Sequence, residues 1–179
     1  MTKNQIRSKI LLELKKQKEE ERKRKSRIIK EKLFNNLFFK KAKTVMFYIA
    51  LDGEVDTTEM IKQARRLGKT IAVPVCGKAR LMRPCLFGPR ARLSKGPYGI
   101  SEPAIKKFID LKDLDLVVVP GLSFDRRGMR LGRGKGYYDY FLKKIPKAAF
   151  SIGLAFGFQV LPYLPSARHD VAVKELIFA

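Results

Sequence analysis

The sequence predicts an α/β fold, a single three-layer domain in which a mostly parallel, Rossmann-like sheet carries helices on both faces. Residues 44–50 (TVMFYIA) and 70–75 (TIAVPV) are β-rich and flank a helical pattern, and such a strand–helix–strand unit favours parallel strands with a right-handed crossover. Residues 116–120 and 150–155 are further apolar runs typical of buried strands. With 179 residues, 45% of them hydrophobic, the chain suffices for one core, and we expect one domain over residues 1–179.

The first 43 residues are expected to form a basic helical segment packed on this domain. Ile6, Ile10 and Leu14 repeat every four residues, as on one face of a helix. Residues 15–27 contain no apolar side chain and indicate either a solvated helix or a break between two helices. A second stripe then resumes helical spacing and is expected in the core: Ile29, Leu33, Phe34, Leu37 and Phe38.

The remaining elements follow in order. Residues 56–59 (DTTE) offer helix N-cap chemistry, and Gly68 is a plausible helix stop. The apolar residues between them lie at helical spacing: Met60, Ile61, Ala64 and Leu67. The other expected elements are a locally paired strand at 79–87, ordered loops at 88–103 and 121–136, a short helix at 137–144 and a final edge strand at 171–178.

The charge of the chain indicates polyanionic partners. Lys and Arg number 39 against 17 acids, which gives a formal charge of +22. Nucleic acid, an acidic membrane surface and phosphate-bearing substrates all suit such an excess. Residues 1–43 alone hold sixteen basic and five acidic side chains, so a basic nucleic-acid-binding module is an alternative function. A Lys-rich soluble surface without a binding role explains the same numbers.

Three observations bear on the compartment. The longest apolar run, residues 45–51, is far shorter than the ~20 residues that span a bilayer, so no membrane association is expected. The first residues lack the apolar stretch of a secretory signal. Cys76 and Cys85 do not make a disulfide framework, which favours a reducing cytoplasm.

The loop expected at 121–136, after the predicted strand at 116–120, carries the clearest chemical signal. Four glycines let the backbone approach a ligand, and three cations can neutralise an anion: Gly128, Gly132, Gly134 and Gly136, with Arg130, Arg133 and Lys135. The helix expected after Gly136 adds unpaired N–H groups, which suit phosphate. The spacing matches neither the dinucleotide fingerprint nor the P-loop pattern. The loop therefore predicts phosphate binding outside the standard nucleotide motifs.

Acidic residues supply the other candidates. Asp139, one turn inside the same helix, either holds a magnesium ion or stabilises the helix start. Glu54, at the end of the first strand, either binds N–H donors of a substrate or is a turn acid. His169 and Asp170 follow a Pro-containing loop, and no Ser/His/Asp triad or zinc-type spacing occurs.

In this order the motifs resemble the 5-formyltetrahydrofolate cyclo-ligase (5,10-methenyltetrahydrofolate synthetase) family along nearly the whole chain. The segments that carry the resemblance are KNQIR at 3–7, GEVDT at 53–57, VPV at 73–75, GISEP at 99–103, VPGLSFD at 119–125, RLGRGKGYYD at 130–139 and HD at 169–170. The run at 130–139 is the most specific of these.

The resemblance implies an ATP-dependent ring closure of 5-formyltetrahydrofolate, with or without a polyglutamyl tail, to 5,10-methenyltetrahydrofolate, releasing ADP and phosphate. It implies ATP as co-substrate, magnesium (Mg2+) as cofactor and a cytoplasmic enzyme. We further expect a monomer without a specific nucleic-acid partner.

The resemblance also assigns residue roles. It implies ATP binding by Lys3, Asn4, Gln5, Ile6, Arg7, Arg130, Leu131, Gly132, Arg133, Gly134, Lys135, Gly136, Tyr137 and Tyr138. It implies folate binding by Glu54, Arg133, Gly134, Lys135, Gly136 and Tyr137. Arg133 and Lys135 are the expected catalytic residues, and Asp139 and Asp170 the expected magnesium ligands.

Overall fold

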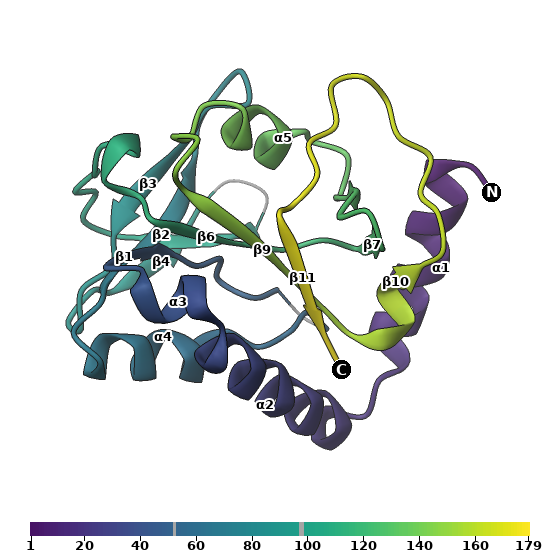
Figure 1. Cartoon of the computed structure of the whole chain (residues 1–179), viewed down its shortest axis with the longest axis horizontal. Helices are drawn as coiled ribbons and strands as arrows, with labels where there is room; N and C mark the ends of the chain where they lie inside the picture. Colours follow the sequence, from purple (N-terminus) through teal and green to yellow (C-terminus); the bar gives the residue numbers. More distant parts are fainter. Residues whose placement is uncertain (52, 97–98) are drawn as a thin grey trace.

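The computed structural model describes residues 1–51, 53–96 and 99–179, and it contains the predicted α/β sheet (Figure 1). Six strands pair in the order β11-β9-β6-β1-β2-β3. Their bounds are β1 Thr44–Met46, β2 Thr70–Cys76, β3 Met82–Leu86, β6 Leu116–Val119, β9 Phe150–Ala155 and β11 Glu175–Phe178. All neighbours are parallel except β2 and β3, which are antiparallel. The prediction of a mostly parallel sheet is confirmed.

The strand order shows at which carboxyl ends of the sheet a ligand is expected to bind. Helix α4 (Thr58–Arg66) connects β1 to β2 on one side of β1, whereas β6, β9 and β11 follow on the other side. The strand order therefore reverses between β1 and β6. In open α/β sheets, ligands bind beyond the carboxyl ends of the strands at such a switch point.

Helices cover both faces of the sheet. The helices α2 (Glu19–Asn35), α3 (Leu37–Lys41) and α4 lie below the sheet in Figure 1, and α5 (Tyr137–Leu142) lies above it. Strand β6 shows why the sheet needs both layers. Its Leu116 and Val118 join the buried cluster with α2 and α4, while Val117 and Val119 join the cluster with α5. The second layer is completed by the short turn η2 (Leu111–Asp113).

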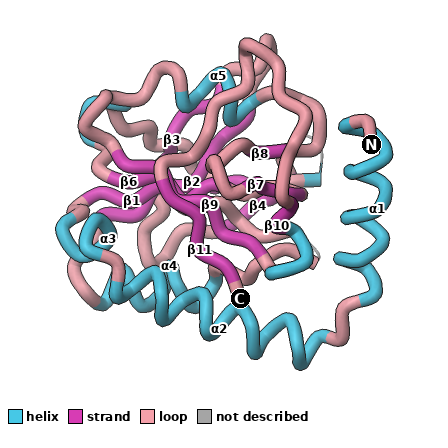
Figure 2. The backbone as a smooth tube through the Cα atoms, turned by 45° about the vertical axis from the view of Figure 1, so that its right-hand side comes forward, coloured by secondary structure: helices cyan, strands magenta, loops and turns pink. Residues whose placement is uncertain are grey.

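The N-terminal segment folds as two helices. Helix α1 (Lys3–Lys16) begins with a capping box between Thr2 and Gln5, and its apolar face is buried as predicted. Helix α1 ends at Lys16 and α2 begins at Glu19. The stretch without apolar side chains therefore contains both the break between the two helices and the solvated start of α2. Helix α1 lies to one side of the sheet, beside a second, small sheet (Figure 2).

Two predictions about helical packing are wrong. Leu37 and Phe38 were expected in the core but are 68% and 49% exposed. The side chain of Asn36 accepts hydrogen bonds from the backbone of a new helix, α3, which restarts out of phase with α2. Phe38 instead stacks on Phe150 with ring centroids 3.6 Å apart. Leu67, which lies at helical spacing as expected, is the C-cap residue of α4 and is exposed.

Both regions expected as loops contain short strands. In 88–103 lie β4 (Leu93–Lys95) and β5 (Ser101–Pro103), which pair antiparallel. In 121–136 lie β7 (Ser123–Asp125) and β8 (Arg130–Leu131), and β7 also pairs with β10 (Val160–Leu161), which follows the turn η3 (Gly157–Gln159). Strands of two or three residues carry no periodic pattern. The β7–β10 pair joins segments more than thirty residues apart, which no local pattern encodes.

Candidate active site

An ion pair between Glu54 and Arg133 joins the segment that follows β1 to the glycine-rich loop that follows β6 and contains β7 and β8. Glu54 follows β1, and Arg133 lies in the glycine-rich loop that follows β6. The Nη2 of Arg133 donates to Oε1 of Glu54 at 3.1 Å. This contact spans the switch point of the sheet, so two motifs 79 residues apart in the chain meet at the predicted binding edge.

Glu54 is held from several directions. Its Oε2 accepts the backbone N–H of Leu51 at 3.0 Å, and its carbonyl accepts from Arg22 at 2.9 Å. Burial raises the pKa of Glu54, while the N–H of Leu51 and the guanidinium of Arg133 oppose that rise. Gly53 adopts a φ of +82°, and a Cβ there would lie 3.1 Å from the backbone of Leu14. A buried carboxylate fixed in this way is suited to orienting a polar ligand.

The glycine-rich loop is supported from below by Asp125. This buried carboxylate accepts the backbone N–H groups of Arg127, Met129 and Leu164, and it pairs with the Arg127 guanidinium at 2.7 Å. Burial acts against the charge, yet these hydrogen bonds keep the pKa of Asp125 lowered. Gly128 (φ +79°) closes the turn, since a Cβ there would meet the carbonyl of Val173 at 2.3 Å.

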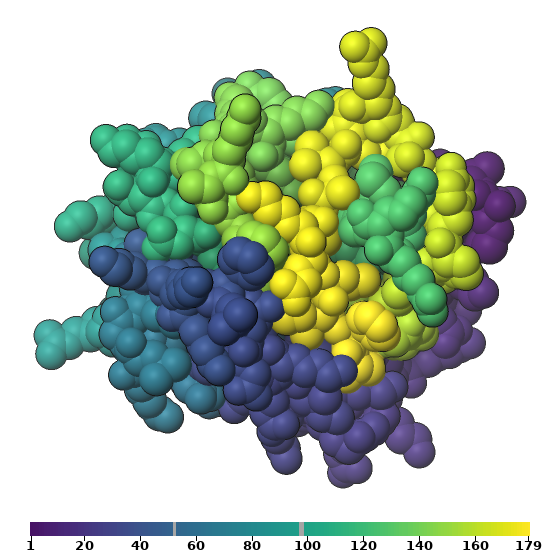
Figure 3. All heavy atoms as spheres, viewed as in Figure 1, coloured from purple at the N-terminus to yellow at the C-terminus, as the bar shows by residue number. Residues whose placement is uncertain are grey.

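Helix α1 reaches the same loop through Arg7. Its Nε donates to the carbonyl of Gly132 at 3.0 Å, and its Nη1 donates to Asn4 at 2.6 Å. Gly134 has a φ of +95°, and its missing Cβ would lie 3.7 Å from the Arg7 guanidinium. The structure thus brings together the predicted segments 3–7 and 130–138, which we call the cradle. In Figure 3 the N-terminal helix (purple) lies beside the C-terminal part of the chain (yellow) at one side of the molecule.

Two ion pairs flank the cradle. Lys3 pairs with Asp170, whose Oδ2 also accepts the N–H of Ala167. Burial opposes the charge of Asp170, but Lys3 and this N–H keep its pKa lowered. Arg130 is buried and pairs with Asp139 at 3.0 Å. The guanidinium of Arg130 therefore lies inside the fold rather than on its surface.

The expected magnesium ligands lie on neighbouring segments. The N–H of Val171 donates to Oδ1 of Asp139 at 3.3 Å, which brings the residue after Asp170 against Asp139. Both carboxylates have cationic partners, Arg130 and Lys3. Across residues 1–51, 53–96 and 99–179, no group of three or more His, Cys, Asp or Glu side chains is arranged to hold a metal ion by itself.

The two tyrosines of the motif differ in environment. The hydroxyl of Tyr137 donates to the carbonyl of Gly77 at 2.8 Å and so ties α5 to the end of β2. The hydroxyl of Tyr138 is buried and finds no hydrogen-bond partner among the residues that the structure describes, and the same holds for Nε of Arg130. Burial raises the pKa of Tyr138. Unpaired buried polar atoms are costly, so these two groups fit a site that a ligand completes.

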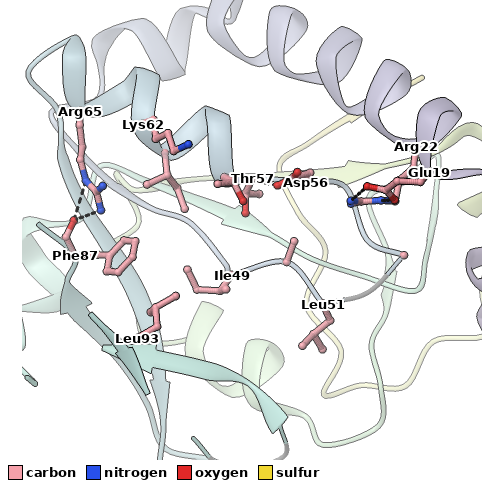
Figure 4. A pocket seen from close by; sticks show the side chains of 14 residues that line it. Glu19, Arg22, Ile49, Leu51, Asp56, Thr57, Lys62, Arg65, Phe87 and Leu93 are labelled. Atoms are coloured by element: carbon pink, nitrogen blue, oxygen red, sulfur yellow. Dashed lines mark hydrogen bonds and ion pairs between the residues drawn. The ribbon is translucent and has the colours of Figure 1, made fainter. Parts of the chain in front are cut away.

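A cavity of about 660 Å³ opens beside residues 49–51 and Gly53 (Figure 4). We call it the pocket. Its walls come from α2, α4, the end of β3 and β4, and they include Glu19, Arg22, Ile49, Ala50, Leu51, Gly53, Asp56, Thr57, Thr58, Ile61, Lys62, Arg65, Phe87 and Leu93. Its volume is within the range of small-molecule sites.

The pocket combines apolar and cationic walls. The ring of Phe87 is covered by the guanidinium of Arg65 at 4.6 Å, and Arg65 also donates to the Phe87 carbonyl. Arg22 forms a bidentate salt bridge with Glu19 and donates to the carbonyl of Glu54, so it connects the pocket to the Glu54–Arg133 ion pair. An aromatic ligand with an anionic group suits such walls. No sequence pattern marks Arg22, Arg65 or Phe87 as site residues, because these side chains come from separate elements without a shared motif.

The expected ATP-binding and folate-binding residues are thus gathered at one edge of the sheet. Lys135 is exposed on the cradle, and Gly136 caps α5 in the left-handed conformation. Helix α5 has six residues, so the dipole of this short helix adds little to the attraction of an anion at its first N–H groups. No helix in the described part of the chain has the length and apolar character needed to cross a membrane.

Comparisons with known proteins identify the family of the chain. The model of the 5-formyltetrahydrofolate cyclo-ligase family matches residues 1–179. The mouse 5-formyltetrahydrofolate cyclo-ligase is 30% identical over 171 residues, which cover 89% of this chain and 84% of the mouse protein. The Escherichia coli K12 cyclo-ligase is 29% identical over 144 residues, covering 76% of this chain and 78% of that protein.

Solved structures show the same fold. The NMR structure of Aquifex aeolicus 5,10-methenyltetrahydrofolate synthetase superposes with a TM-score of 0.87 at 34% identity, covering 99% of this chain and 90% of that one. The Mycoplasma pneumoniae synthetase superposes with a TM-score of 0.82 at 22% identity, covering 99% and 98%, and at that identity it supports the fold alone. On the whole-chain family match and these relatives, the chain belongs to the 5-formyltetrahydrofolate cyclo-ligase family.

Proposed function

We propose that this protein catalyses the ATP-dependent cyclisation of 5-formyltetrahydrofolate to 5,10-methenyltetrahydrofolate, with release of ADP and phosphate. The observation that carries the proposal is the Glu54–Arg133 pair, because it joins the two halves of a two-substrate site. The cradle lies at its Arg133 end, and the pocket opens beside the segment that bears Glu54. A ligase that transfers a phosphoryl group between two bound molecules needs such adjoining sites.

The reaction requires activation of a poor leaving group. The formyl oxygen attacks the γ-phosphorus, so a new P–O bond forms while the bond to the bridging oxygen breaks and ADP departs. Nitrogen 10 of the folate then attacks the formyl carbon. The C–N bond forms, the C–O bond breaks, and phosphate leaves with the former formyl oxygen, while the proton of nitrogen 10 passes to water. No protein nucleophile is required, and alignment and charge neutralisation are the enzyme's main tasks.

The cradle is the proposed ATP site. Its backbone approaches closely at Gly132 and Gly134, where Arg7 packs against the loop. Lys3 and Arg7 from α1 would bind phosphate oxygens, and Lys135 and Arg133 would neutralise the charge of the transferring group. Arg130, the ion-pair partner of Asp139, would also bind phosphate oxygens. The remaining members of the two segments would contribute backbone and packing contacts: Asn4, Gln5, Ile6, Leu131, Gly136, Tyr137 and Tyr138.

The pocket is the proposed folate site. Apolar side chains such as Phe87 and Leu93 would cover a ring of the folate, and the nearby cations would meet its carboxylates, including those of a polyglutamyl tail. The carboxylate of Glu54 would accept N–H groups of the pterin. Because Arg133 is already bound to Glu54, it would face both substrates at once. Gly134, Lys135, Gly136 and Tyr137 would border the folate from the cradle side.

Asp139 and Asp170 fit magnesium in chemistry and position. Both offer hard carboxylate oxygens, and the Val171 contact places their segments side by side. Their present partners, Arg130 and Lys3, are themselves proposed phosphate ligands. The cations would therefore turn toward ATP phosphates as the carboxylates turn toward the ion. When bound, magnesium would neutralise part of the phosphate charge.

The basic N-terminal segment is used within this scheme. Helix α1 supplies cradle residues, and the acids at the start of α2 pair with neighbouring cations such as Arg22 and Arg24. We therefore propose no separate nucleic-acid function. We also propose a cytoplasmic monomer, in keeping with two free, buried cysteines, and light scattering of the purified protein tests the oligomeric state.

The proposed reaction is tested by the absorbance of the methenyl product. The folded protein is incubated with ATP, magnesium and 5-formyltetrahydrofolate, and omission of ATP is the control. ATP-dependent formation of product supports the proposal. Folded protein that binds both substrates without forming product would overturn the reaction, and protein that binds neither would overturn the site.

A further inference from the structure

The turn that joins β2 to β3 holds an unusual backbone. Ala79 and Arg80 have φ angles of 52° and 60°, in the left-handed region that glycine prefers. The turn is closed by hydrogen bonds from Gly77 to the carbonyl of Leu81 and from Leu81 to that of Lys78. For L-residues with a Cβ this conformation is unfavourable, and strained residues of this kind concentrate at ligand sites.

The strained turn directs Arg80 onto the cradle. A Cβ on Gly136 would lie 3.7 Å from the Cδ of Arg80 and 3.8 Å from both Nε and Nη1. The hydroxyl of Tyr137 is bound to Gly77 of the same turn at 2.8 Å. The hydrogen bond of Tyr137 therefore ties the turn to the start of α5, and the Arg80 side chain lies within van der Waals distance of the position that a Cβ on Gly136 would take.

The guanidinium of Arg80 has N–H donors that no described residue occupies. Its side chain is exposed, and it makes no hydrogen bond or ion pair with any residue that the structure describes. Arg7 occupies the matching position at the other end of the loop, where it packs on Gly134 while bonded to Gly132. Two arginines from different elements thus bracket the stretch from Gly134 to Gly136. A guanidinium with free donors beside a phosphate-binding loop is suited to binding phosphate oxygens.

We propose that Arg80 is a further nucleotide-binding residue, which contacts the triphosphate of ATP from the side of the cradle opposite Arg7. The inference rests on the proposed function only in taking ATP as the ligand of the cradle. The left-handed conformation at Arg80 then serves binding, because a turn with negative φ angles would direct the side chain away from the cradle. The sequence motifs end at Val75 before this turn, so they gave no signal for Arg80.

The test uses two glycine variants with the same relief of strain. In Arg80→Gly the guanidinium is removed, and in Ala79→Gly it is kept. Both should unfold at the same temperature as the wild type or a higher one. Calorimetry with a non-hydrolysable ATP analogue should show binding about tenfold to a hundredfold weaker for Arg80→Gly, and unchanged binding for Ala79→Gly. Arg80→Lys should recover part of the loss.

The outcomes separate the alternatives. Unchanged nucleotide binding in a folded Arg80→Gly protein would overturn the proposal. Weaker binding of 5-formyltetrahydrofolate with unchanged binding of the analogue would also overturn it, and would assign Arg80 to the folate. Equal loss in both glycine variants would show that the turn, not the guanidinium, matters. Because the measurement needs no turnover, it stands if the wild type binds nucleotide but forms no methenyl product.

Discussion

The cradle and the pocket both adjoin the segment between β1 and α4, the cradle through Glu54 and the pocket through Ile49, Leu51 and Gly53, but they are built in different ways. Most of the cradle is one contiguous segment, residues 130–138, completed by Lys3 and Arg7 from the first helix. The pocket is lined by residues of α2, α4, the segment between β1 and α4, the end of β3 and β4. The cradle therefore depends on backbone conformation at a few glycines, whereas the pocket depends on how helices pack on the sheet. Substitutions should accordingly affect the two substrates separately.

The largest effect is expected where the two halves join. Glu54→Ala should lower kcat/KM by about a hundredfold to a thousandfold, because it frees Arg133 and removes the proposed pterin contact together. Steady-state kinetics with each substrate varied in turn measures this. Arg133→Ala should cost a similar amount, and the double variant little more than either single one. Additive losses would show that Glu54 and Arg133 act independently, and so would break the link between cradle and pocket.

The raised pKa of Glu54 predicts how the activity should depend on pH. A carboxylate with a raised pKa takes up its proton at a higher pH than an ordinary glutamate. Since the Arg133 pair and the pterin contact both need the charged form, kcat/KM should fall on the acid side, with a midpoint above the usual value near 4.5. Glu54→Gln should remove this limb. An identical acid limb in Glu54→Gln would assign it to another group.

The next effect concerns the backbone of the cradle alone. Gly134→Ala should weaken ATP binding about tenfold, because an added Cβ strains a residue at φ +95° and so shifts the backbone proposed to approach the phosphates. The matched control is Gly68→Ala, which has a similar φ of +78° but nothing within 4 Å of the added atom. Both should lose comparable stability in thermal unfolding. If ATP binding fell equally in both, the loss would reflect general strain and not the cradle.

Sequence reasoning succeeded where local chemistry and structure coincide. The burial of Ile6, Ile10 and Leu14, and the full extent of β9, followed from periodicity and apolar runs. Phosphate binding by the glycines and cations of the cradle motif stays a prediction. The prediction for Phe38 failed because Asn36 restarts the helix, an event decided by a single cap.

The pocket was not predictable for a different reason. Phe87 and Arg65 meet only after α4 crosses from β1 to β2 and β3 pairs back. Each is an ordinary residue of its own element, so no spacing marks them. The same holds for Arg80, whose role depends on the conformation of a turn and on a glycine 56 positions later.

A smaller effect should appear on the folate side. Phe87→Ala should raise KM for 5-formyltetrahydrofolate several-fold to about tenfold and leave KM for ATP unchanged, because it removes an apolar wall of the pocket. Phe178→Ala is a control, since that ring is exposed and lies against Lys32. A change in KM for ATP alone would show that the pocket serves the nucleotide and would reverse the assignment of the two sites.

The smallest effect concerns the support beneath the cradle. The pKa of Asp125 is lowered in the folded state, so its charge contributes stability that is present above the ordinary aspartate pKa and is lost as pH falls through the folded value. Unfolding by urea should therefore become easier below about pH 4. Asp125→Asn should lower stability at pH 7 by about 1–3 kcal/mol and flatten this acid dependence. The exposed Asp113 gives the control, because Asp113→Asn removes a carboxylate that supports no loop. If both variants kept the wild-type pH dependence, Asp125 would not hold the loop by its charge, and the stability of the cradle would have to come from Gly128 and its contact with Val173.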